Sequence, residues 1–364
     1  MSTVMNNVMN NEIRTILVDQ ANKLFTDHAT KDIIDTAEQG TWPDALWQAL
    51  EKTGLTRAAV PEDHDGAGAS FSDAMAILRQ AGGFGVPVPL AETLIAGWLM
   101  GQCGVTPPSG PIAFAADTAR STVSLQKASS GWTASGTLYA VSWGRHISSA
   151  VAITADENGN NHLVVIDPKN GSLTEGTNIA GEPRDDITLN NVMLTDEDVH
   201  AVSKPFDETS LEQLGALSRV VMMAGALDRV LDLSVQHAKD REQFGRPISK
   251  FQAMQQTLAV LAGEAAAAGA ASDAAVEALE MGSGAFQIAA AKVRAGEAAS
   301  EAATIAHQVH GAMGFTYEHP LHQLTRRLWA WRDEFGTDGD WAIKLGALAL
   351  REGGDGLWPL ITAS

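Results

Sequence analysis

Cysteine, long apolar runs and positive charge are all scarce in this sequence. The 364 residues include one cysteine, Cys103. One cysteine can form neither an internal disulfide bond nor a cysteine-based metal site, which fits a reducing compartment. No run of about 18 apolar residues occurs, so we predict no membrane span. Residues 1–13 hold several asparagines and no apolar stretch of the secretory kind. These absences together predict a cytoplasmic protein.

Basic residues are outnumbered by acidic ones. The chain has 25 Lys and Arg residues against 44 Asp and Glu residues, which gives a net charge of −19 and a pI near 4.8. A surface this negative repels phosphate backbones and anionic lipid headgroups, so nucleic acid and membrane surfaces are not expected partners. The charge carries no information about the fold.

The familiar short motifs of phosphate and metal sites are missing as well. There is no G-x-G-x-x-G, no G-x-x-x-x-G-K-[ST] and no H-E-x-x-H. The 10 histidines are dispersed, and Pro320 separates His319 from His322. We therefore expect no metal site.

Three parts with different periodicity follow one another along the chain. Apolar residues recur at helical spacing in the first part, in segments 13–25, 42–50, 71–80 and 91–101. Short runs rich in Val, Ile, Thr and Ala follow, separated by Gly, Asn, Asp and Pro at intervals of about ten residues, which is typical of antiparallel strands. The loop 156–161 contains Asn-Gly and is expected to close a hairpin.

The last part is rich in alanine and helical again. Long periodic stretches cover 211–239, 251–279 and 284–308, and their length indicates a helical bundle. At about 100–200 residues per domain, the length allows two or three domains. We predict an α+β multidomain fold with an N-terminal helical domain (1–109), a central antiparallel β domain (110–206) and a C-terminal long-helix bundle (207–364).

Two segments of the bundle are more specific than the rest. The first runs from Arg241 to Gln252 and reads REQFGRPISKFQ. The second runs from Gln308 to Pro320, reads QVHGAMGFTYEHP, and is followed after a helix by Glu-Phe-Gly-Thr at 334–337. Each also has a purely structural interpretation as a corner between helices, where Gly and Pro only redirect the chain. Spacing alone leaves both interpretations open.

These segments resemble the signatures of the flavin-dependent acyl-CoA dehydrogenases. The first is similar to the R-x-x-F-G-x-x-I-x-x-x-Q pattern of that family, and the second to its Q-x-x-G-x-x-G-[FY] pattern. The stretch from Trp47 to Asp73 and the order of the three parts also fit, so the resemblance covers nearly the whole chain. It implies an acyl-CoA dehydrogenase-like fold and FAD as the cofactor.

The resemblance also assigns residues to the cofactor. It implies that Arg241, Phe244 and Gln252 reach the FAD of a neighbouring subunit, with the guanidinium on the pyrophosphate. It places three further residues against FAD: Gln308, Gly311 and Ala312. Thr337 matches the threonine of the family's E-G-T motif, which donates to the cofactor. A site shared between chains implies an oligomer, a homo- or heterotetramer.

The chemistry implied by the resemblance is the α,β-desaturation of an acyl-CoA thioester. A carboxylate removes the α-proton while the β-hydride goes to flavin N5, and hydrogen bonds to the thioester carbonyl stabilise the developing enolate. The expected electron acceptor is an electron-transfer flavoprotein. The acyl group cannot be read from the sequence.

The position of the catalytic base departs from the family pattern. Phe335 stands where the family has its glutamate before Gly-Thr, and the alternative position on the long helix falls near Gly215. Glu334, one residue away, is the candidate base if the loop is re-routed. Its other interpretation is a solvated acid in the charged run 332–334.

The β part departs from the family pattern too. Its usual flavin-facing T-E-P-x-x-G-S-D and W-I-T stretches are absent, although Ser142 is a candidate donor to the flavin. Trp143 either replaces the stacking tryptophan from a shifted position or belongs to the core. The arginine often found on the long helix near CoA is unmatched, with Arg219 one turn later.

Three functions therefore stay open. The first is an acyl-CoA dehydrogenase with a relocated base, acting on an unusual or bulky acyl group. The second is a non-catalytic or FAD-completing subunit of a heteromeric dehydrogenase, as in some steroid side-chain-degrading enzymes. The third is a flavin-free scaffold.

Overall fold

A computed structural model describes residues 2–202, 206–207, 209–282 and 284–362. The chain forms two compact units. One comprises Met1–Ala81 with Val86–Ser218, and the other comprises Gly82–Gly85 with Arg219–Ser364. The predicted domain boundaries at 109 and 206 stay predictions, and the second lies beside residues 203–205 and 208, which are outside the described residues.

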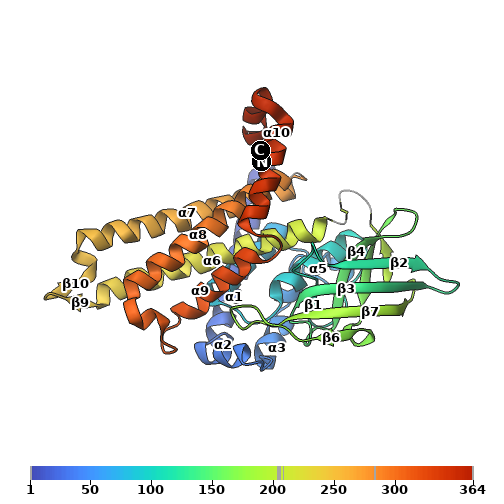
Figure 1. The fold of residues 1–364 in the computed structure, drawn as a ribbon, viewed down its shortest axis with the longest axis horizontal. Coiled ribbons are helices and arrows are strands. Elements are labelled where there is room, and N and C mark those ends of the chain that lie inside the picture. The colour runs from blue at the N-terminus through green and yellow to red at the C-terminus, as the bar shows by residue number, and fades with distance from the viewer. Residues whose placement is uncertain (1, 203–205, 208, 283, 363–364) are drawn as a thin grey trace. The chain divides into compact units, whose positions relative to one another are not determined.

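The first unit begins with helices, as the periodicity predicts (Figure 1). They are α1 (Ser2–His28), α2 (Lys31–Glu38), α3 (Asp44–Lys52), α4 (Phe71–Phe84) and α5 (Leu90–Gln102). Helix α2 was not predicted, because only two of its eight residues, Ile34 and Ala37, are buried apolar anchors. Helix α5 is buried on nearly all sides, so it forms the centre of this helical layer.

Two four-stranded sheets follow in the same unit. One has the order β1-β4-β5-β8, and the other has the order β2-β3-β7-β6. Their strands are β1 (Ile112–Ala113), β2 (Thr122–Lys127), β3 (Trp132–Ser142), β4 (Ser149–Ala155), β5 (Asn161–Ile166), β6 (Ser172–Thr174), β7 (Arg184–Leu194) and β8 (Val199–Ala201). All named pairs are antiparallel except β1 with β4. The β2–β3 hairpin lies between β1 and β4 in sequence, which makes the connection long enough for a parallel pairing.

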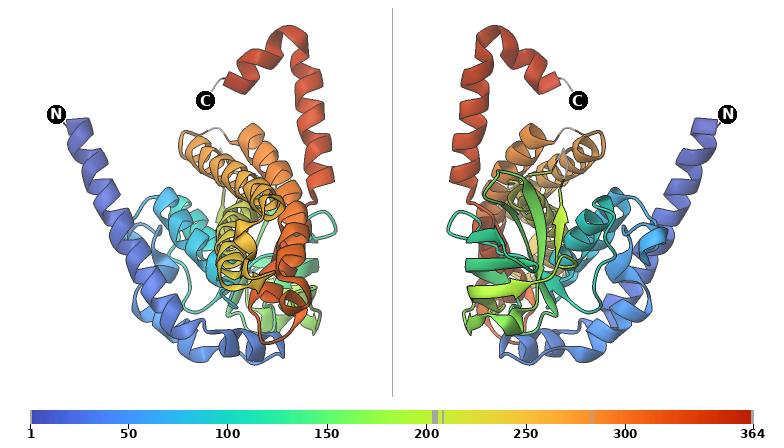
Figure 2. Two further views of the ribbon diagram at one scale, coloured as in Figure 1. Left: turned by 90° about the vertical axis from the view of Figure 1, so that its left-hand side faces the viewer. Right: turned by 90° about the vertical axis from the view of Figure 1, so that its right-hand side faces the viewer.

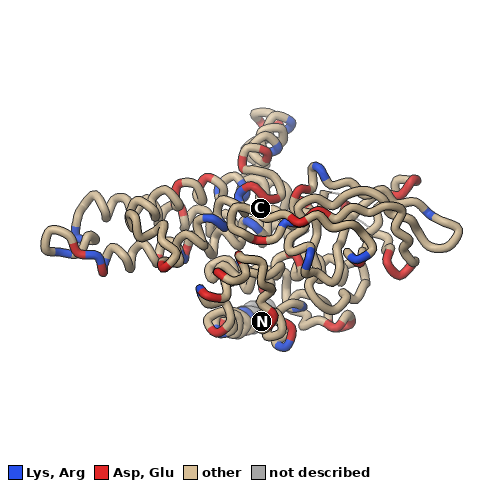
Figure 3. Tube along the Cα trace, turned by 60° about the horizontal axis from the view of Figure 1, so that its bottom comes forward, with Lys and Arg blue, Asp and Glu red and all other residues tan. Residues whose placement is uncertain are grey.

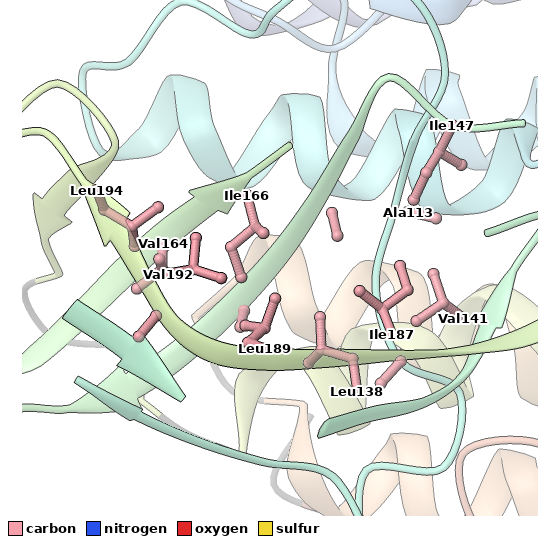
Figure 4. Close-up of a cluster of buried hydrophobic side chains, with 14 of the residues drawn as sticks. Ala113, Leu138, Val141, Ile147, Val164, Ile166, Ile187, Leu189, Val192 and Leu194 are labelled. Carbon is pink, nitrogen blue, oxygen red and sulfur yellow. The ribbon is translucent and has the colours of Figure 1, made fainter. Parts of the chain in front are cut away.

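The core of the β domain lies between the two sheets. Figure 4 shows Leu138 and Val141 of β3, Ile187 of β7 and Val164 and Ile166 of β5 pointing toward one another. All five side chains are almost fully buried. The predicted hairpin loop joins β4 to β5, and the carboxylate at its first position, 156, accepts two backbone N–H groups of the turn. This hairpin was read correctly because its turn chemistry is local.

The second unit is the helical bundle. It contains most of α6 (Ser210–Asp240), together with α7 (Gln252–Glu280), α8 (Ala285–His310), α9 (Leu321–Asp333) and α10 (Asp338–Thr362) (Figure 1). Every third or fourth residue of α8 is a buried alanine, including Ala291, Ala295, Ala298 and Ala302. Side chains this small let the backbone of α8 lie close to its neighbours. The predicted fold class is confirmed in all three parts.

Helix α10 was not predicted. Its start is fixed by a capping box in which Thr337 and Asp340 exchange hydrogen bonds. The helix turns sharply at Gly353, where φ is +69° (Figure 2). Leu350 and Trp358 are exposed on it, so its apolar residues do not mark one buried face at helical spacing.

One helix of the described residues, α7, is long and apolar enough to cross a membrane. Its most apolar window has a mean hydropathy of 1.2, and 39% of that window is buried in the structure. A single helix of this kind is a weak indication, because core helices of water-soluble proteins have the same length and composition. The absence of a membrane span stays a prediction.

Candidate functional site

The segment from Arg241 to Gln252 forms an exposed turn between α6 and α7. Two short strands, β9 (Glu242–Gln243) and β10 (Arg246–Pro247), pair as an antiparallel hairpin. Its two turn residues, Phe244 and Gly245, both have positive φ, 52° and 77°, as the twist of a two-residue hairpin requires. Basic and acidic residues alternate along this turn (Figure 3).

Phe244 is the most exposed large apolar residue of this turn. Its exposed fraction is 93%, and its positive φ is uncommon for a residue with a bulky side chain. Phe251 meets it edge to face at 6.2 Å, and the guanidinium of Arg246 lies 4.2 Å from the centre of the Phe251 ring. Arg241 and Gln252 are exposed beside them. The hairpin turn holds Phe244 in this conformation and presents its ring and the neighbouring cations outward.

The second signature lies at the C-terminal end of α8. Gln308 is exposed on the last turn of the helix, and Gly311 ends it with φ 60° and ψ −144°. Only glycine adopts this conformation without strain. A side chain added at Gly311 would meet nothing within 4 Å, so the backbone here is open to an outside group. Ala312 follows in the exposed short helix η5 (Gly311–Phe315).

Histidines join the two signatures at one end of the bundle. His237, one turn before Arg241, stacks on His310 with ring centres 4.5 Å apart. His310 also meets His319 at 4.7 Å. Burial is the main cause that lowers the pKa of all three, and it lowers that of His319, together with the neighbouring imidazoles, to about 4. No group of three or more His, Cys, Asp and Glu among the described residues could hold a metal ion.

Glu334, the candidate base, lies in the corner between α9 and α10. Its Oε2 accepts from Nε of Arg219 at 2.6 Å, and the exposed fractions of the two side chains are 10% and 2%. The interpretation as a solvated acid is therefore wrong. Phe335 is buried next to the pair, with its ring centre 5.1 Å from Cζ of Arg219. The carboxylate is thus engaged in a buried ion pair through its Oε2.

A second cation, Lys292 of α8, lies under the same corner. It is fully buried, and its Nζ donates to the carbonyl oxygens of Trp331 at 3.2 Å and Arg332 at 2.5 Å. Burial lowers the pKa of Lys292 to about 7, although the nearby carboxylate of Glu334 acts in the opposite direction. Lys292 was missed in the sequence, because nothing local distinguishes it from an exposed lysine.

The residues assigned to FAD form two groups within the bundle. Thr337 lies at the start of α10, where α8 at Gly296 packs directly against Asp338. The remaining bundle residues lie at the other end of α8, around Gly311. At about 1.5 Å per residue, the rise along α8 from Gly296 to Gly311 is about 22 Å. The bundle residues that the resemblance assigns to FAD therefore lie in two separate regions of the chain.

The β-domain candidates are buried in their own unit. Ser142 ends β3 with an exposed fraction of 1%, and Trp143 is 3% exposed with φ 56°. The Trp143 ring meets Trp42 edge to face at 5.7 Å and His146 at 6.1 Å. Trp143 is therefore a core residue, which confirms the second of its two interpretations.

The two halves of a FAD site fit this chain unequally. Around Arg241 and Gly311, the exposed cations, the outward phenyl ring and the open glycine backbone suit a pyrophosphate and an adenosine. Ser142 and Trp143, by contrast, are 1% and 3% exposed, and the Trp143 ring packs against Trp42 and His146. This part of the chain therefore offers a flavin ring no exposed side chain at these two positions, and the role of Ser142 stays a prediction.

Comparison with known proteins places these features in a family. A family model described as the N-terminal domain of acyl-CoA dehydrogenase matches residues 11–105, and one described as the C-terminal domain matches residues 211–339. The acyl-CoA dehydrogenase IpdE2 of Mycolicibacterium smegmatis is 28% identical over 320 residues, 87% of this chain and 92% of its own length.

Solved structures share the fold at lower identity. The ChsE4–ChsE5 complex from Mycobacterium tuberculosis contains a chain that matches with a TM-score of 0.81 and 19% identity, over 92% of this chain and 96% of that one. A variant of the Tcur3481–Tcur3483 steroid acyl-CoA dehydrogenase matches with a TM-score of 0.81 and 23% identity, over 93% and 98%. These likenesses show the fold alone.

Proposed function

This chain belongs to the acyl-CoA dehydrogenase family, and we propose that it takes part in the FAD-dependent α,β-desaturation of an acyl-CoA thioester. The observation that carries the proposal is the outward-facing turn at Arg241 and Phe244 beside the open backbone of Gly311. When bound, FAD supplies the acceptor for the hydride that leaves the β-carbon. The compartment and the electron acceptor stay as predicted, cytoplasmic and an electron-transfer flavoprotein.

Within this function, we propose that the chain acts as the FAD-completing subunit of a heteromeric enzyme. Arg241 would neutralise the pyrophosphate, and Phe244 would pack against the adenosine of a cofactor held mainly by a neighbouring chain. Gln252, Gln308 and Ala312 would line the same region. The burial of Trp143 supports this role, because its ring packs against Trp42 inside this chain's own β domain instead of facing outward to a flavin ring.

The state of Glu334 points in the same direction. A general base must reach the substrate α-carbon with a free oxygen, whereas this carboxylate accepts from Arg219 in a buried pair. Phe335, at the family's usual base position, is buried and has no ionisable group. The base would then come from the partner chain, and the tetramer would be a heterotetramer.

The description of one structural relative supplies a first substrate class to test. One structural relative is described as a steroid acyl-CoA dehydrogenase of two chains. We propose that the acyl group here is likewise bulky and polycyclic, and that it binds mainly to the base-carrying partner. Acyl-CoAs with a steroid-derived group are the first substrates to assay, with butyryl-CoA as the small comparison substrate.

Purification alone and with a partner tests the role of the chain. We expect a colourless protein when the chain is expressed alone and a yellow complex when it is expressed with a related acyl-CoA dehydrogenase chain. Yellow protein from the single chain that bleaches with acyl-CoA would refute the FAD-completing role. A colourless product in both cases, with folded protein, would leave the flavin-free scaffold as the function.

Two substitutions separate cofactor binding from base chemistry in the assembled complex. Arg241→Ala is expected to reduce the FAD content, whereas the exposed control Arg351→Ala leaves it unchanged. Glu334→Gln is expected to retain bleaching by acyl-CoA, because the base is not on this chain. Retained flavin with abolished bleaching in Glu334→Gln, but not in the exposed control Glu301→Gln, would identify Glu334 as the base.

A further inference from the structure

Lys292 occupies an unusual place for a lysine. It is 0% exposed on a face of α8 that is otherwise lined by alanines. Its Nζ donates to the carbonyl oxygens of Trp331 and Arg332 at 3.2 and 2.5 Å, both in the last turn of α9. The last carbonyls of a helix have no partner within the helix. A buried ammonium group at this position supplies the missing donors and complements the helix dipole.

Two other contacts hold the residues that follow. Arg219 of α6 pairs with Glu334 at 2.6 Å. Trp341 of α10 donates from its indole nitrogen to the carbonyl of Phe335 at 2.8 Å. Elements α6, α8 and α10 therefore each fix one side of the corner 331–335. The corner leads directly into Thr337 and the capping box that starts α10.

The fit around this corner is tight on both sides. A side chain at Gly296, one turn after Lys292 on α8, would lie 2.7 Å from Cβ of Asp338. At Gly336, an added Cβ would lie 2.9 Å from Nε1 of Trp341. The position of α10 therefore depends on the exact end of α9. Only a long side chain with several donors reaches both carbonyl oxygens from the buried face of α8.

We propose that Lys292 is a positioning residue. It fixes the end of α9, and through it the Glu334–Thr337 corner that presents Thr337 to a cofactor. The proposal rests on the proposed function only for the role of Thr337; the fixing of the corner does not depend on any cofactor. Lys292 itself need not touch substrate or FAD.

Hydrogen–deuterium exchange tests the positioning directly. In Lys292→Met, which keeps the length but loses the donors, the amides of residues 333–341 are expected to exchange about tenfold faster than in the wild type. Peptides of α7 are expected to exchange at the wild-type rate. Lys292→Arg restores donors and is expected to return the corner to slow exchange. Lys239→Met, at an exposed lysine of the same unit, is the matched control.

The FAD content of the assembled complex supplies the second readout. We expect Lys292→Met to lose FAD at least about threefold faster on dilution, and Lys292→Arg to retain it. Unchanged corner exchange in a folded Lys292→Met protein would overturn the proposal, as would a loosened corner with wild-type FAD retention. If Lys292→Met does not fold, Lys292→Gln, which replaces the charged ammonium group by a neutral amide on a shorter side chain, takes its place. If no preparation binds flavin, the proposed function fails while the exchange result still decides the fixing of the corner.

Discussion

Lys292 should make the stability of this protein depend on pH in a specific window. Its pKa falls from an ordinary 10.5 to about 7 because burial disfavours the charged form. The folded state then binds fewer protons than the unfolded state between pH 7 and 10.5, so stability rises with pH across that window. Below pH 7 both states are protonated at this site, and it adds no further slope.

The size of the effect follows from the same two values. The full fall in pKa means that burying the charged ammonium group lowers the free energy of unfolding by about 5 kcal/mol at low pH. Between pH 7 and pH 9, the folded state loses this proton, and the free energy of unfolding rises by about 2 kcal/mol. Lys292→Met has no proton to release, so the difference in unfolding free energy between wild type and variant should grow by about 2 kcal/mol over this range.

Urea unfolding of wild type and Lys292→Met at pH 6, 7, 8 and 9 measures this difference. Comparing the two proteins at each pH cancels the groups that titrate in both. The exposed control Lys239→Met should run parallel to the wild type. Parallel curves for wild type and Lys292→Met from pH 7 to 9 would refute the reasoning, because they would show that the ammonium group carries no burial penalty.

Three further changes test other parts of the structure. Burial and the neighbouring imidazoles lower the pKa of His319 to about 4 in the folded protein. On acidification the unfolded protein therefore binds a proton at this residue before the folded protein does, so stability should fall as the pH drops from about 6.5 to 4. His319→Gln should reduce that fall, as measured by thermal melts across this pH range. Asp185 is fully buried and paired with Arg145, so Asp185→Ala should destabilise the first unit by about 3–5 kcal/mol in urea, and a loss below about 1 kcal/mol would count against a buried pair. Gly296→Ala should cost about 1–3 kcal/mol by overpacking against α10, whereas Gly263→Ala on α7, with nothing within 4 Å, should stabilise by about 0.5–1 kcal/mol.

The helices and strands that the sequence predicts correctly share one property. Their signals are local: helical spacing in α6, α7 and α8, short β-branched runs in the β domain, and turn residues in the β4–β5 loop. Helix α10 was not predicted, because several of its apolar residues, including Leu350 and Trp358, face outward and Gly353 interrupts the helix. The hairpin β9–β10 escaped because strands of two residues carry no period.

The residues of the candidate site also differ in whether a local sequence signal reveals them. The FAD signatures could be recognised because their residues are dense and closely spaced around Arg241 and Gln308. The partner of Glu334 could not, since Arg219 lies 115 positions away in sequence. Lys292 carries no local signal at all, as its role depends on carbonyls some 40 positions later. Charge pairs and buried cations are set by tertiary packing, which a single sequence does not display.

The geometry of α8 bears on the proposed role of this chain, in which it has no catalytic base of its own and completes the FAD site of a partner. Gly311 lies about 22 Å along this helix from Gly296, which packs against Asp338 beside Thr337, so the two regions need not contact the same cofactor. In the proposed FAD-completing role, substitutions at the base position and in the flavin-facing part of the β domain would affect one site only, while the exposed turn at Arg241 would continue to serve another. In that case, natural selection on the assembled enzyme would conserve the residues around Arg241 and would no longer conserve those at the base and flavin-facing positions. The exposed Phe244 and the buried Trp143 are the two features that the proposed FAD-completing role predicts.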